Sequence, residues 1–354
     1  MKLRYGIIGT GEIGLSKHLP GYSKVDDVEI VAACDVDLKQ AEKAAKEFGA
    51  SFVTDNYKEL LARNDIDFVS ICLPNYLHSK VTAEALQSGK HVHCEKPMAM
   101  SAEEARSMLN AKKAAGKKLM IGLNNRFTPY AWFVRDMIKS GKLGDIYHVN
   151  CGWKRRNGLP ASDWFADRSK SGGGPFIDLG VHFVDLSMSF LGYPDVETVS
   201  ACTYTNFGAS KTRIVNGIPI DRERVYDVED IAVGMIRLAN NSSINFEISW
   251  ASNIAQEQQF YEILGTKGGL RFEAGPGIKD GARLTYSENA YGQDIDSVFG
   301  INGNLYRTTE FSYFVDCIKN DTEPLLALPE EGVKMMEIVD AVYKSAKMRC
   351  EVVL

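Results

Sequence analysis

Two short motifs contain residues that could move a proton to or from a hydroxyl group. The first is Glu95-Lys96-Pro97, which follows an apolar run, and its proline cannot extend a strand because it has no N–H to donate. We therefore expect Lys96 at the rim of a sheet. The second motif contains Asp178 and His182. If Pro175 begins a helix, these two side chains stand at i and i+4 on one face.

The residue types suit acid–base chemistry. A histidine exchanges protons near neutral pH because its ordinary pKa lies there. An ammonium group stabilises negative charge that develops on an oxygen atom, and a carboxylate can orient a hydroxyl group. Taken alone, however, Lys96 fits a solvated loop residue, and Asp178 with His182 fits a helix cap or a surface contact. The elements that position these residues decide between the two interpretations.

A glycine-rich motif near the start of the chain indicates a binding site for a dinucleotide. Gly9-Thr10-Gly11-Glu12-Ile13-Gly14 matches the GxGxxG pattern, follows the apolar run Leu3–Ile8, and precedes Asp35 at the end of the next apolar run. The first glycine allows a tight turn, the second lets the backbone approach a pyrophosphate, and the third lets helix and strand pack closely. An ordinary turn beside a solvated aspartate is the alternative.

Asp35 favours NAD over NADP. Its carboxylate would accept hydrogen bonds from both hydroxyls of the adenosine ribose and would repel a 2′-phosphate, and Val36 offers no arginine to compensate. The residues expected to hold the pyrophosphate at the helix N-terminus are Gly9, Gly11, Glu12, Ile13 and Gly14.

Apolar runs alternate with amphipathic helical runs through the first third of the chain, which predicts a parallel sheet with helices on both faces. Asp37 and Ser101 are expected as helix N-caps, and Pro20 should kink or shorten the first helix. Ligands of such a sheet bind beyond the carboxyl ends of the strands, where Lys96 is placed. The expected strands are Leu3–Ile8, Val28–Cys34, Ser51–Val53, Phe68–Cys72, His91–Cys94 and Leu119–Gly122.

After about Asn125 the chain changes to longer β-type runs joined by hairpin turns such as Asn240-Asn241. We predict two domains: a dinucleotide-binding α/β domain over residues 1–123 with a doubly wound parallel sheet, and an α+β domain over residues 124–354 with a large, open, mostly antiparallel sheet. The chain offers few helices for the second face of that sheet. We therefore expect it to pack against another subunit in a homodimer or homotetramer. The expected strands of this sheet are Ile146–Trp153, Val196–Tyr204, Asp230–Leu238, Ser243–Ser249, Gln259–Leu264 and Leu270–Glu273, and the expected helices are Tyr130–Ser140, Thr309–Ile318 and Glu330–Met348.

Composition limits the remaining possibilities. A net charge of −5 over 354 residues argues against nucleic acid or an anionic membrane as partner. The seven cysteines are scattered and form no CxxC pair, which indicates reduced thiols and a cytoplasmic location. We expect neither a signal peptide nor a membrane span, since the first residues turn polar quickly and no apolar run is long enough. His91 and His93 share a strand face but lack further ligands at suitable spacing, so no metal is expected.

The motifs together resemble the Gfo/Idh/MocA family of oxidoreductases, the group of glucose-fructose oxidoreductase and inositol dehydrogenase. The likeness covers essentially the whole chain. It rests on the segments GTGEIG, LPNYLH, EKP, NRF and GGGPFIDLGVH, in this order. The resemblance implies a Rossmann domain followed by an α/β domain with an open sheet that is often used for oligomerisation.

The resemblance also implies roles for individual residues. Lys96, Asp178 and His182 would form the catalytic group, with His182 as general acid and base. Asn75, His78 and Glu95 would lie near the nicotinamide ribose, and the other residues expected to bind the cofactor beyond the strand ends are Leu73, Pro74, Lys96 and Asn124. The residues expected to contact substrate are Lys96, Asn125, Arg155, Asp178 and His182. Some inositol-oxidising members have a second arginine where this chain has Asn125, and the stretch Trp153–Pro160 resembles a substrate or cofactor loop.

The expected activity is NAD-dependent hydride transfer between the cofactor and a secondary hydroxyl of a sugar, sugar derivative or cyclitol. Two alternatives stay open. One is an enzyme that cleaves or isomerises glycosides with tightly held NAD and no net redox change. The other is a protein that senses the dinucleotide without chemistry, against which the intact set of Lys96, Asp178 and His182 argues.

Overall fold

The computed structural model describes residues 2–160, 163–208, 214–215, 218–219, 225–276, 278, 282–300 and 308–354. The chain forms two compact units. Unit 1 is Met1–Asn124 with Thr308–Met336, and unit 2 is Asn125–Arg307 with Glu337–Leu354. The division of cofactor and substrate binding between residues 1–123 and 124–354 stays a prediction.

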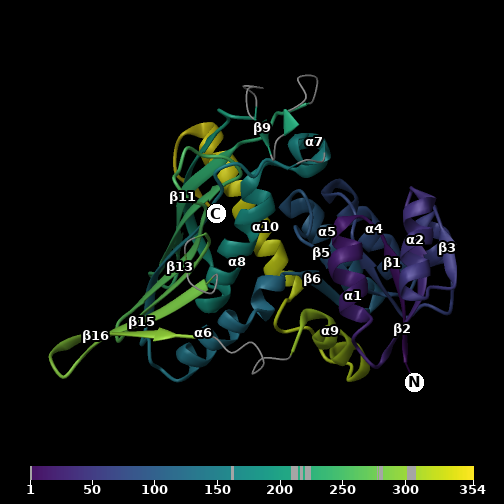
Figure 1. Ribbon diagram of the computed structural model, residues 1–354, viewed down its shortest axis with the longest axis horizontal. Helices are drawn as coiled ribbons and strands as arrows, with labels where there is room; N and C mark the ends of the chain where they lie inside the picture. The colour runs from purple at the N-terminus through teal and green to yellow at the C-terminus, as the bar shows by residue number, and fades with distance from the viewer. Residues whose placement is uncertain are drawn as a thin grey trace. The chain divides into compact units, whose positions relative to one another are not determined.

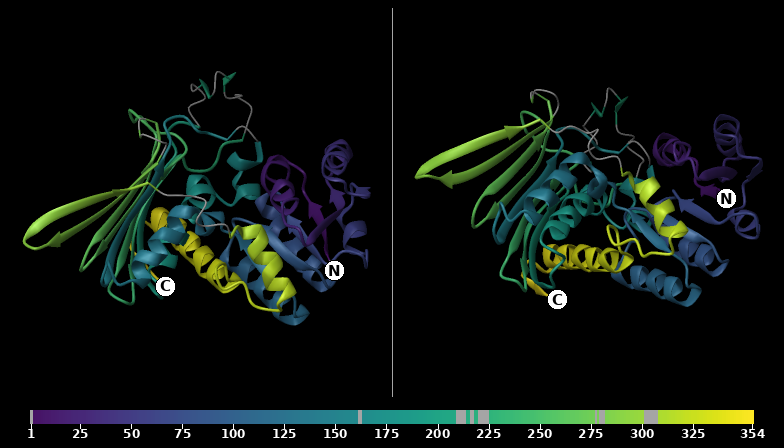
Figure 2. Two further views of the ribbon diagram at one scale, coloured as in Figure 1. Left: turned by 60° about the horizontal axis from the view of Figure 1, so that its bottom comes forward. Right: turned by 90° about the horizontal axis from the view of Figure 1, so that it is seen from below.

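Unit 1 contains a six-stranded parallel sheet with strand order β3-β2-β1-β4-β5-β6. Helices connect consecutive strands and lie on both faces of the sheet (Figure 2). The predicted doubly wound sheet is therefore confirmed, and its strand order reverses between β1 and β4. The strands are β1 (Leu3–Ile8), β2 (Val28–Cys34), β3 (Phe52–Thr54), β4 (Phe68–Ile71), β5 (His91–Glu95) and β6 (Leu119–Gly122). The helices between them are α1 (Leu19–Tyr22), α2 (Leu38–Phe48), α3 (Tyr57–Leu61), α4 (Asn75–Gln87) and α5 (Ala102–Ala115).

The helix termini of unit 1 follow the sequence signals. Asp37 and Ser101 cap α2 and α5 by accepting hydrogen bonds from backbone amides, and Gly49 and Gly116 end the same helices in the left-handed conformation. The first helix is short, as Pro20 predicts. A π-helical turn over Gly14–His18 precedes α1, because Pro20 has no N–H for a regular helical ladder.

The chain returns to unit 1 near its end. Helix α9 (Glu310–Lys319) packs on α1, where the Phe311 ring lies against Gly21 so closely that a Cβ there would stand 2.3 Å from the ring. Helix α10 (Pro329–Met348) follows, and its residues divide between the two units.

Unit 2 contains a nine-stranded sheet with strand order β16-β15-β14-β13-β7-β12-β11-β8-β17. Only β7 and β12 pair in parallel, and every other neighbouring pair is antiparallel. The predicted large, mostly antiparallel sheet is confirmed. Its strands are β7 (Ile146–Lys154), β8 (Val196–Tyr204), β11 (Ile231–Leu238), β12 (Ser243–Ser249), β13 (Gln258–Gly265), β14 (Gly269–Ala274), β15 (Ala282–Ala290), β16 (Gln293–Phe299) and β17 (Val352–Val353). A separate pair is formed by β9 (Ile214–Val215) and β10 (Ile218–Pro219).

The hairpin of β15 and β16 was absent from the predicted strands. It extends from one end of the sheet (Figure 1) and turns at Tyr291 and Gly292, whose φ angles are 57° and 74°. Most positions of β16 are exposed to solvent. A strand with no buried face carries no period-two hydrophobic pattern, so only its turn could have revealed it.

Helices cover one face of the nine-stranded sheet (Figure 1). They are α6 (Pro129–Lys139), α8 (Val181–Phe190) and the unit 2 part of α10. Buried aromatic rings fill this layer, such as Phe183, which stacks on Tyr261 at 4.7 Å between ring centroids. On β14 the alternate side chains Arg271 and Glu273 lie on the other face and are charged.

No helix within the described ranges is long and apolar enough to span a membrane. All seven cysteines are free thiols, and Cys202 and Cys350 are the exposed ones among them. In the part of the chain that the structure describes, no three His, Cys, Asp or Glu side chains gather as metal ligands.

Candidate functional site

The glycine turn after β1 has the shape that a pyrophosphate requires. Gly9 has a φ of +97°, and a Cβ there would meet the Cys72 carbonyl oxygen at 2.2 Å. A Cβ at Gly14 would meet the Gly9 carbonyl oxygen at 2.4 Å, so the first and third glycines are fixed by close packing. A Cβ at Gly11 would meet nothing within 4 Å, and Gly11, Glu12 and Ile13 are exposed. The open side of the turn thus leaves room for a phosphate group to approach the backbone.

Asp35 lies directly beside this turn. Its Oδ2 accepts hydrogen bonds from the Thr10 amide at 2.7 Å and the Thr10 hydroxyl at 3.2 Å, and its Oδ1 accepts from the Asp37 amide at 3.0 Å. Asp35 is half-buried, whereas the next residue, Val36, is 91% exposed. The carboxylate therefore braces the glycine turn from the end of β2 and still reaches the rim of the sheet.

Glu95, at the end of β5, is held by a buried histidine. Its Oε1 lies 2.9 Å from His18 Nε2, and its Oε2 accepts the Lys96 amide at 3.1 Å. His18 Nδ1 in turn lies 2.8 Å from the Ser70 hydroxyl. Burial raises the pKa of Glu95, but the hydrogen bond and charge interaction with His18 outweigh burial and, with Lys96 and His93, lower it to about 2. Glu95 is thus a carboxylate that fixes the backbone at Lys96.

The segment after β4 is anchored through His78. Leu73 and Pro74 are half-buried, Asn75 is 4% exposed, and His78 is 1% exposed. The Nδ1 atom of His78 lies 2.7 Å from the Pro97 carbonyl oxygen, and its Nε2 lies 2.7 Å from the Leu73 carbonyl oxygen. His78 therefore joins the segment after β4 to the segment that follows Lys96.

Three more of the residues predicted to bind cofactor or substrate follow the strands β5 and β6. Lys96, Asn124 and Asn125 are each half-buried, and the two asparagines begin a 3-10 turn that ends at Phe127. Arg126 in the same turn is buried and donates to Asp185 at 2.7 Å and 2.5 Å. This ion pair fixes the turn, so Arg126 itself is turned into the core of unit 2.

Pro175 begins the helix that carries Asp178 and His182, as expected. The first turn, Phe176–Gly180, is π-helical and continues into α8. Asp178 and His182 are both half-buried. The Asp178 Oδ2 accepts a hydrogen bond from the indole N–H of Trp250 at 2.9 Å, and the Trp250 ring is completely buried. The indole thus holds the Asp178 carboxylate in one orientation.

A buried carboxylate holds the glycine-rich stretch ahead of that helix. Glu229 accepts the amides of Gly174 at 2.9 Å and Phe176 at 3.2 Å, and the Tyr343 hydroxyl at 2.9 Å. A Cβ at Gly173 would lie 2.0 Å from the Tyr343 hydroxyl, and one at Gly174 would lie 2.2 Å from the Glu229 carbonyl oxygen. These glycines are required because backbone and side chains pack directly against them.

Arg155 lies at the end of β7 beside an aromatic ring. Its guanidinium carbon is 4.3 Å from the centroid of the Trp153 ring. The Arg155 carbonyl oxygen accepts the hydroxyls of Ser249 and Ser252. Arg156 is exposed, and Trp164 stacks on Phe165 at 3.9 Å between ring centroids.

Known proteins match the chain along most of its length. Residues 3–123 match the NAD-binding Rossmann fold of an oxidoreductase family, GFO/IDH/MocA, and residues 132–271 match the C-terminal domain of the same family. The D-glucoside 3-dehydrogenase of Escherichia coli (strain K12) is 32% identical over 351 residues, which cover 98% of this chain and 95% of that protein. The chain belongs to the GFO/IDH/MocA family.

Two further relatives illustrate the range of this family. The D-xylose 1-dehydrogenase (NADP(+)) 2 of Haloferax volcanii is 28% identical and covers 98% of each chain. A solved structure of levoglucosan dehydrogenase, in complex with NADH and levoglucosan, shares the fold with a TM-score of 0.84 at 23% identity, covering 100% of this chain and 99% of that one. As a member of the GFO/IDH/MocA family, this chain is an oxidoreductase with an NAD-binding Rossmann domain.

Three residues that support the candidate site of this family member were absent from the sequence interpretation. They are His18, Glu229 and Trp250, and each forms a hydrogen bond with a residue that is distant in the chain. Neither His18, in the segment GLSKHLPGY, nor Glu229, in the segment YDVED, stands in a local pattern that marks it as buried. The partner of a buried polar group cannot be identified from a local pattern alone.

Proposed function

We propose that this enzyme transfers hydride between NAD and a secondary hydroxyl of a sugar, sugar derivative or cyclitol. The full-length match to the D-glucoside 3-dehydrogenase of Escherichia coli carries this proposal, because both domains of the chain align with that protein. The glycine turn supports the cofactor half of the proposal, since its open side at Gly11 suits a pyrophosphate.

The choice of NAD over NADP rests on Asp35. Its carboxylate faces the glycine turn at the rim of the sheet and would repel a 2′-phosphate on the adenosine ribose. The neighbouring Val36 side chain is exposed and uncharged, so it cannot attract one. The relative from Haloferax volcanii is named for NADP(+), which makes the comparison of both cofactors an essential measurement.

The cofactor would be held at three places in unit 1. Gly9, Gly11, Glu12, Ile13 and Gly14 would bind the pyrophosphate, and Asp35 the adenosine ribose. The nicotinamide end would be held by Leu73, Pro74, Asn75, His78, Glu95, Lys96 and Asn124. When bound, the nicotinamide ring accepts or returns the hydride.

Lys96, Asp178 and His182 would then perform the acid–base part of the reaction. His182 takes the proton of the substrate hydroxyl as general base and returns it in the reverse direction. The Lys96 ammonium stabilises the negative charge on that oxygen, and Asp178 orients a substrate hydroxyl or the imidazole. The indole of Trp250 keeps the Asp178 carboxylate in place for this role. Asn125 and Arg155 would bind further hydroxyls of the substrate.

A fluorescence screen for NADH tests the proposal. The unmodified protein is given NAD or NADP together with hexoses, glycosides, anhydrosugars and inositols in turn. We expect NADH to form with at least one of these carbohydrates and NADP to serve poorly. Absence of NADH formation with every class, together with dinucleotide that survives desalting, would replace this proposal by the enzyme that holds its cofactor permanently.

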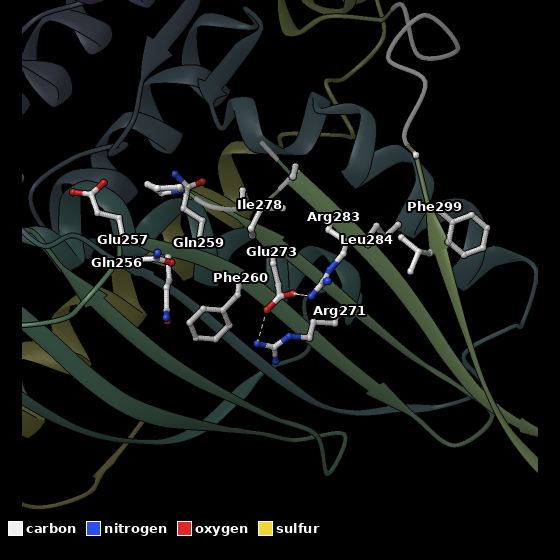
Figure 3. A pocket seen from close by; sticks show the side chains of 16 residues that line it. Gln256, Glu257, Gln259, Phe260, Arg271, Glu273, Ile278, Arg283, Leu284 and Phe299 are labelled. Carbon is white, nitrogen blue, oxygen red and sulfur yellow. Dashed lines mark hydrogen bonds and ion pairs between the residues drawn. The ribbon is translucent and has the colours of Figure 1, made fainter. Parts of the chain in front are cut away.

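We also propose that the face of the nine-stranded sheet opposite the helices joins two copies of the chain in a homodimer, on its own or within a homotetramer. This face contains a hollow of about 1070 Å³ above β13, β14 and β15 (Figure 3). Inside it Glu273 binds Arg271 at 2.9 Å and Arg283 at 2.7 Å, and these charges alternate across the strands. Alternating charges suit a face that meets its own copy across a two-fold axis. Sedimentation equilibrium tests the proposal, and a monomer at micromolar concentration would contradict it.

A further inference from the structure

His78 has hydrogen-bond partners that can only accept. It lies in the first turn of α4 and is 1% exposed. Helix α4 packs against β5 (Figure 1). Its Nδ1 lies 2.7 Å from the carbonyl oxygen of Pro97, and its Nε2 lies 2.7 Å from that of Leu73. Both distances are short for an N–H···O hydrogen bond.

This arrangement determines the protonation state of the ring. A neutral imidazole carries one N–H, and its second nitrogen presents a lone pair. At 2.7 Å that lone pair would face the lone pairs of a carbonyl oxygen, and a buried acceptor would lose its donor. Only the imidazolium form donates to both oxygens, and such charge-assisted bonds are the shorter and stronger ones.

The other described histidines of unit 1 have a different environment. His18 faces the Ser70 hydroxyl, and His93 Nδ1 lies 2.8 Å from the Tyr22 hydroxyl. His91 Nδ1 accepts the Lys118 amide at 3.0 Å. His91 and His93 each have a partner that can donate, so the neutral form suits these two rings. His18 lies between the Ser70 hydroxyl and the Glu95 carboxylate. Among them His78 is the one placed between two carbonyl groups.

We propose that His78 is an imidazolium brace, charged at neutral pH, that ties the segment after β4 to the segment after β5 and thereby positions Lys96. The protonation state follows from the two carbonyl contacts alone. The positioning role rests on the proposed function, because it assumes that Lys96 acts on the substrate. His78 itself has both ring nitrogens engaged, so it is a positioning residue rather than a catalytic one.

The charged groups around His78 fit this assignment. Burial lowers the pKa of His78, but Cys94 on β5 and the carbonyls of Pro97 and Leu73 outweigh burial and raise it to about 9. Lys96 stands next to Pro97, and the N-terminus of α4 also carries positive character, so both oppose the charge. On α5, which packs against α4, the Glu104 carboxylate accepts the Met100 amide.

The sign of the pH dependence follows directly. The folded protein binds this proton more tightly than the unfolded chain, whose histidine has a pKa near 6.5. The stabilisation is therefore complete below about pH 6.5 and is lost as the pH rises through about 9. Above that range one of the two carbonyl oxygens loses its donor.

Nitrogen-15 NMR of the histidine rings in the full chain tests the charge. The His78→Gln variant identifies the His78 signals by their disappearance, and His148→Gln, which changes a histidine of unit 2, serves as the matched control. We expect both ring nitrogens of His78 to be protonated at neutral pH, with a midpoint near 9. A neutral ring at neutral pH would overturn the proposal, and this measurement needs only the unmodified protein if the variant fails to fold.

Steady-state kinetics tests the positioning role. We expect kcat of His78→Gln to fall about tenfold or more, because a loosened Lys96 is misplaced, while His148→Gln keeps the parental value. In the pH profile, kcat of the parent should also fall as the pH rises through about 9, and kcat of His78→Gln should not show this fall. Parental kcat and an unchanged pH profile in His78→Gln would overturn the positioning role. A charged ring in a protein that oxidises no carbohydrate would instead contradict the proposed function and leave the brace intact.

Discussion

The two units hold the segments of the candidate site by side chains of opposite character. In unit 1 the segments around Lys96 leave carbonyl oxygens without strand partners, and the buried His78 donates to them. In unit 2 the stretch ahead of Asp178 leaves amides without partners, and the buried Glu229 accepts from them. A segment whose carbonyl oxygens lack partners is thus held by a donor side chain, and a segment whose amides lack partners is held by an acceptor side chain. The backbone group that needs a hydrogen bond, and not the position in the fold, determines which kind of side chain is found there.

Two further residues follow the same rule. Asp35 lies in unit 1, but it faces the amides of Thr10 and Asp37, and so a carboxylate stands there. In unit 2 the buried Asp230 accepts the amides of Phe207 at 2.6 Å and Gly208 at 3.0 Å. Within a helix or a sheet, the backbone amides and carbonyls form hydrogen bonds with one another. A segment that leaves the sheet depends instead on buried side chains for these hydrogen bonds.

Removal of the Lys96 ammonium group, which the proposed brace in unit 1 positions, should have the largest effect on activity. Lys96→Met is expected to lower kcat by about 10²–10³-fold, because the charge on the substrate oxygen loses its stabilising ammonium group. Steady-state kinetics and a fluorescence titration with NADH measure both properties, and NADH affinity should change little. Lys80→Met, at an exposed position of α4, is the control. Parental turnover in Lys96→Met would remove this residue from the mechanism.

Loss of the carboxylate brace of unit 2 should have the next largest effect. Glu229→Ala leaves the buried amides of Gly174 and Phe176 without an acceptor, and we expect the free energy of unfolding to fall by about 3 kcal/mol. Urea denaturation measures this change. Glu247→Ala, which removes a surface ion pair with Lys154, should cost less than about 1 kcal/mol. Equal losses in the two variants would break the comparison.

The indole of Trp250 should matter more for activity than for folding. Trp250→Phe keeps an aromatic ring but removes the N–H that holds Asp178, so we expect kcat to fall about tenfold. The free energy of unfolding should fall by about 1–3 kcal/mol because the smaller ring leaves a void. Trp132→Phe in α6 is the control and should keep the parental kcat. If kcat of Trp250→Phe matches the parent, Asp178 needs no such support.

Glu310 in unit 1 should show the smallest effect and the clearest pH dependence. It is 6% exposed, and burial together with the negative charge of Glu95 raises its pKa to about 8. Its Oε2 lies 4.0 Å from His93 Nε2, but burial lowers the pKa of His93, so this contact joins two neutral groups near pH 7.

The folded protein therefore holds the proton of Glu310 more tightly than the unfolded chain, where the pKa is near 4.5. The stability that this proton contributes is full below about pH 4.5 and declines as the pH rises to about 8. Glu310→Gln should thus match the parent in acid and exceed its Tm above pH 8. Glu47→Gln, at an exposed position of α2, is the control. If the Tm of Glu310→Gln does not exceed that of the parent above pH 8, ionisation of Glu310 does not destabilise the folded protein.

Local sequence patterns were sufficient to predict most helices and strands, but they did not predict the buried side chains that hold the candidate site in place. The strand β1 and the helices α2 and α5 were predicted from apolar periodicity and N-caps, because those signals lie within a few residues of one another. The strand β16 escaped because its residues bury no common face, and β15 buries Leu284 and Tyr286 in a strand that is otherwise mostly polar. His18 and Glu95 are 77 positions apart, and no pattern along the chain connects them.

The order of elements, the glycine turn and the types of residue available for catalysis can be read along the chain, because each depends on neighbouring residues and on backbone conformation. Which buried group meets which segment depends on the folded arrangement: His78 lies between two carbonyls, Glu229 accepts from the glycine-rich stretch, and Trp250 donates to Asp178. The physical reason is that an unpaired polar group is costly only once it is buried, and burial is a property of the folded chain.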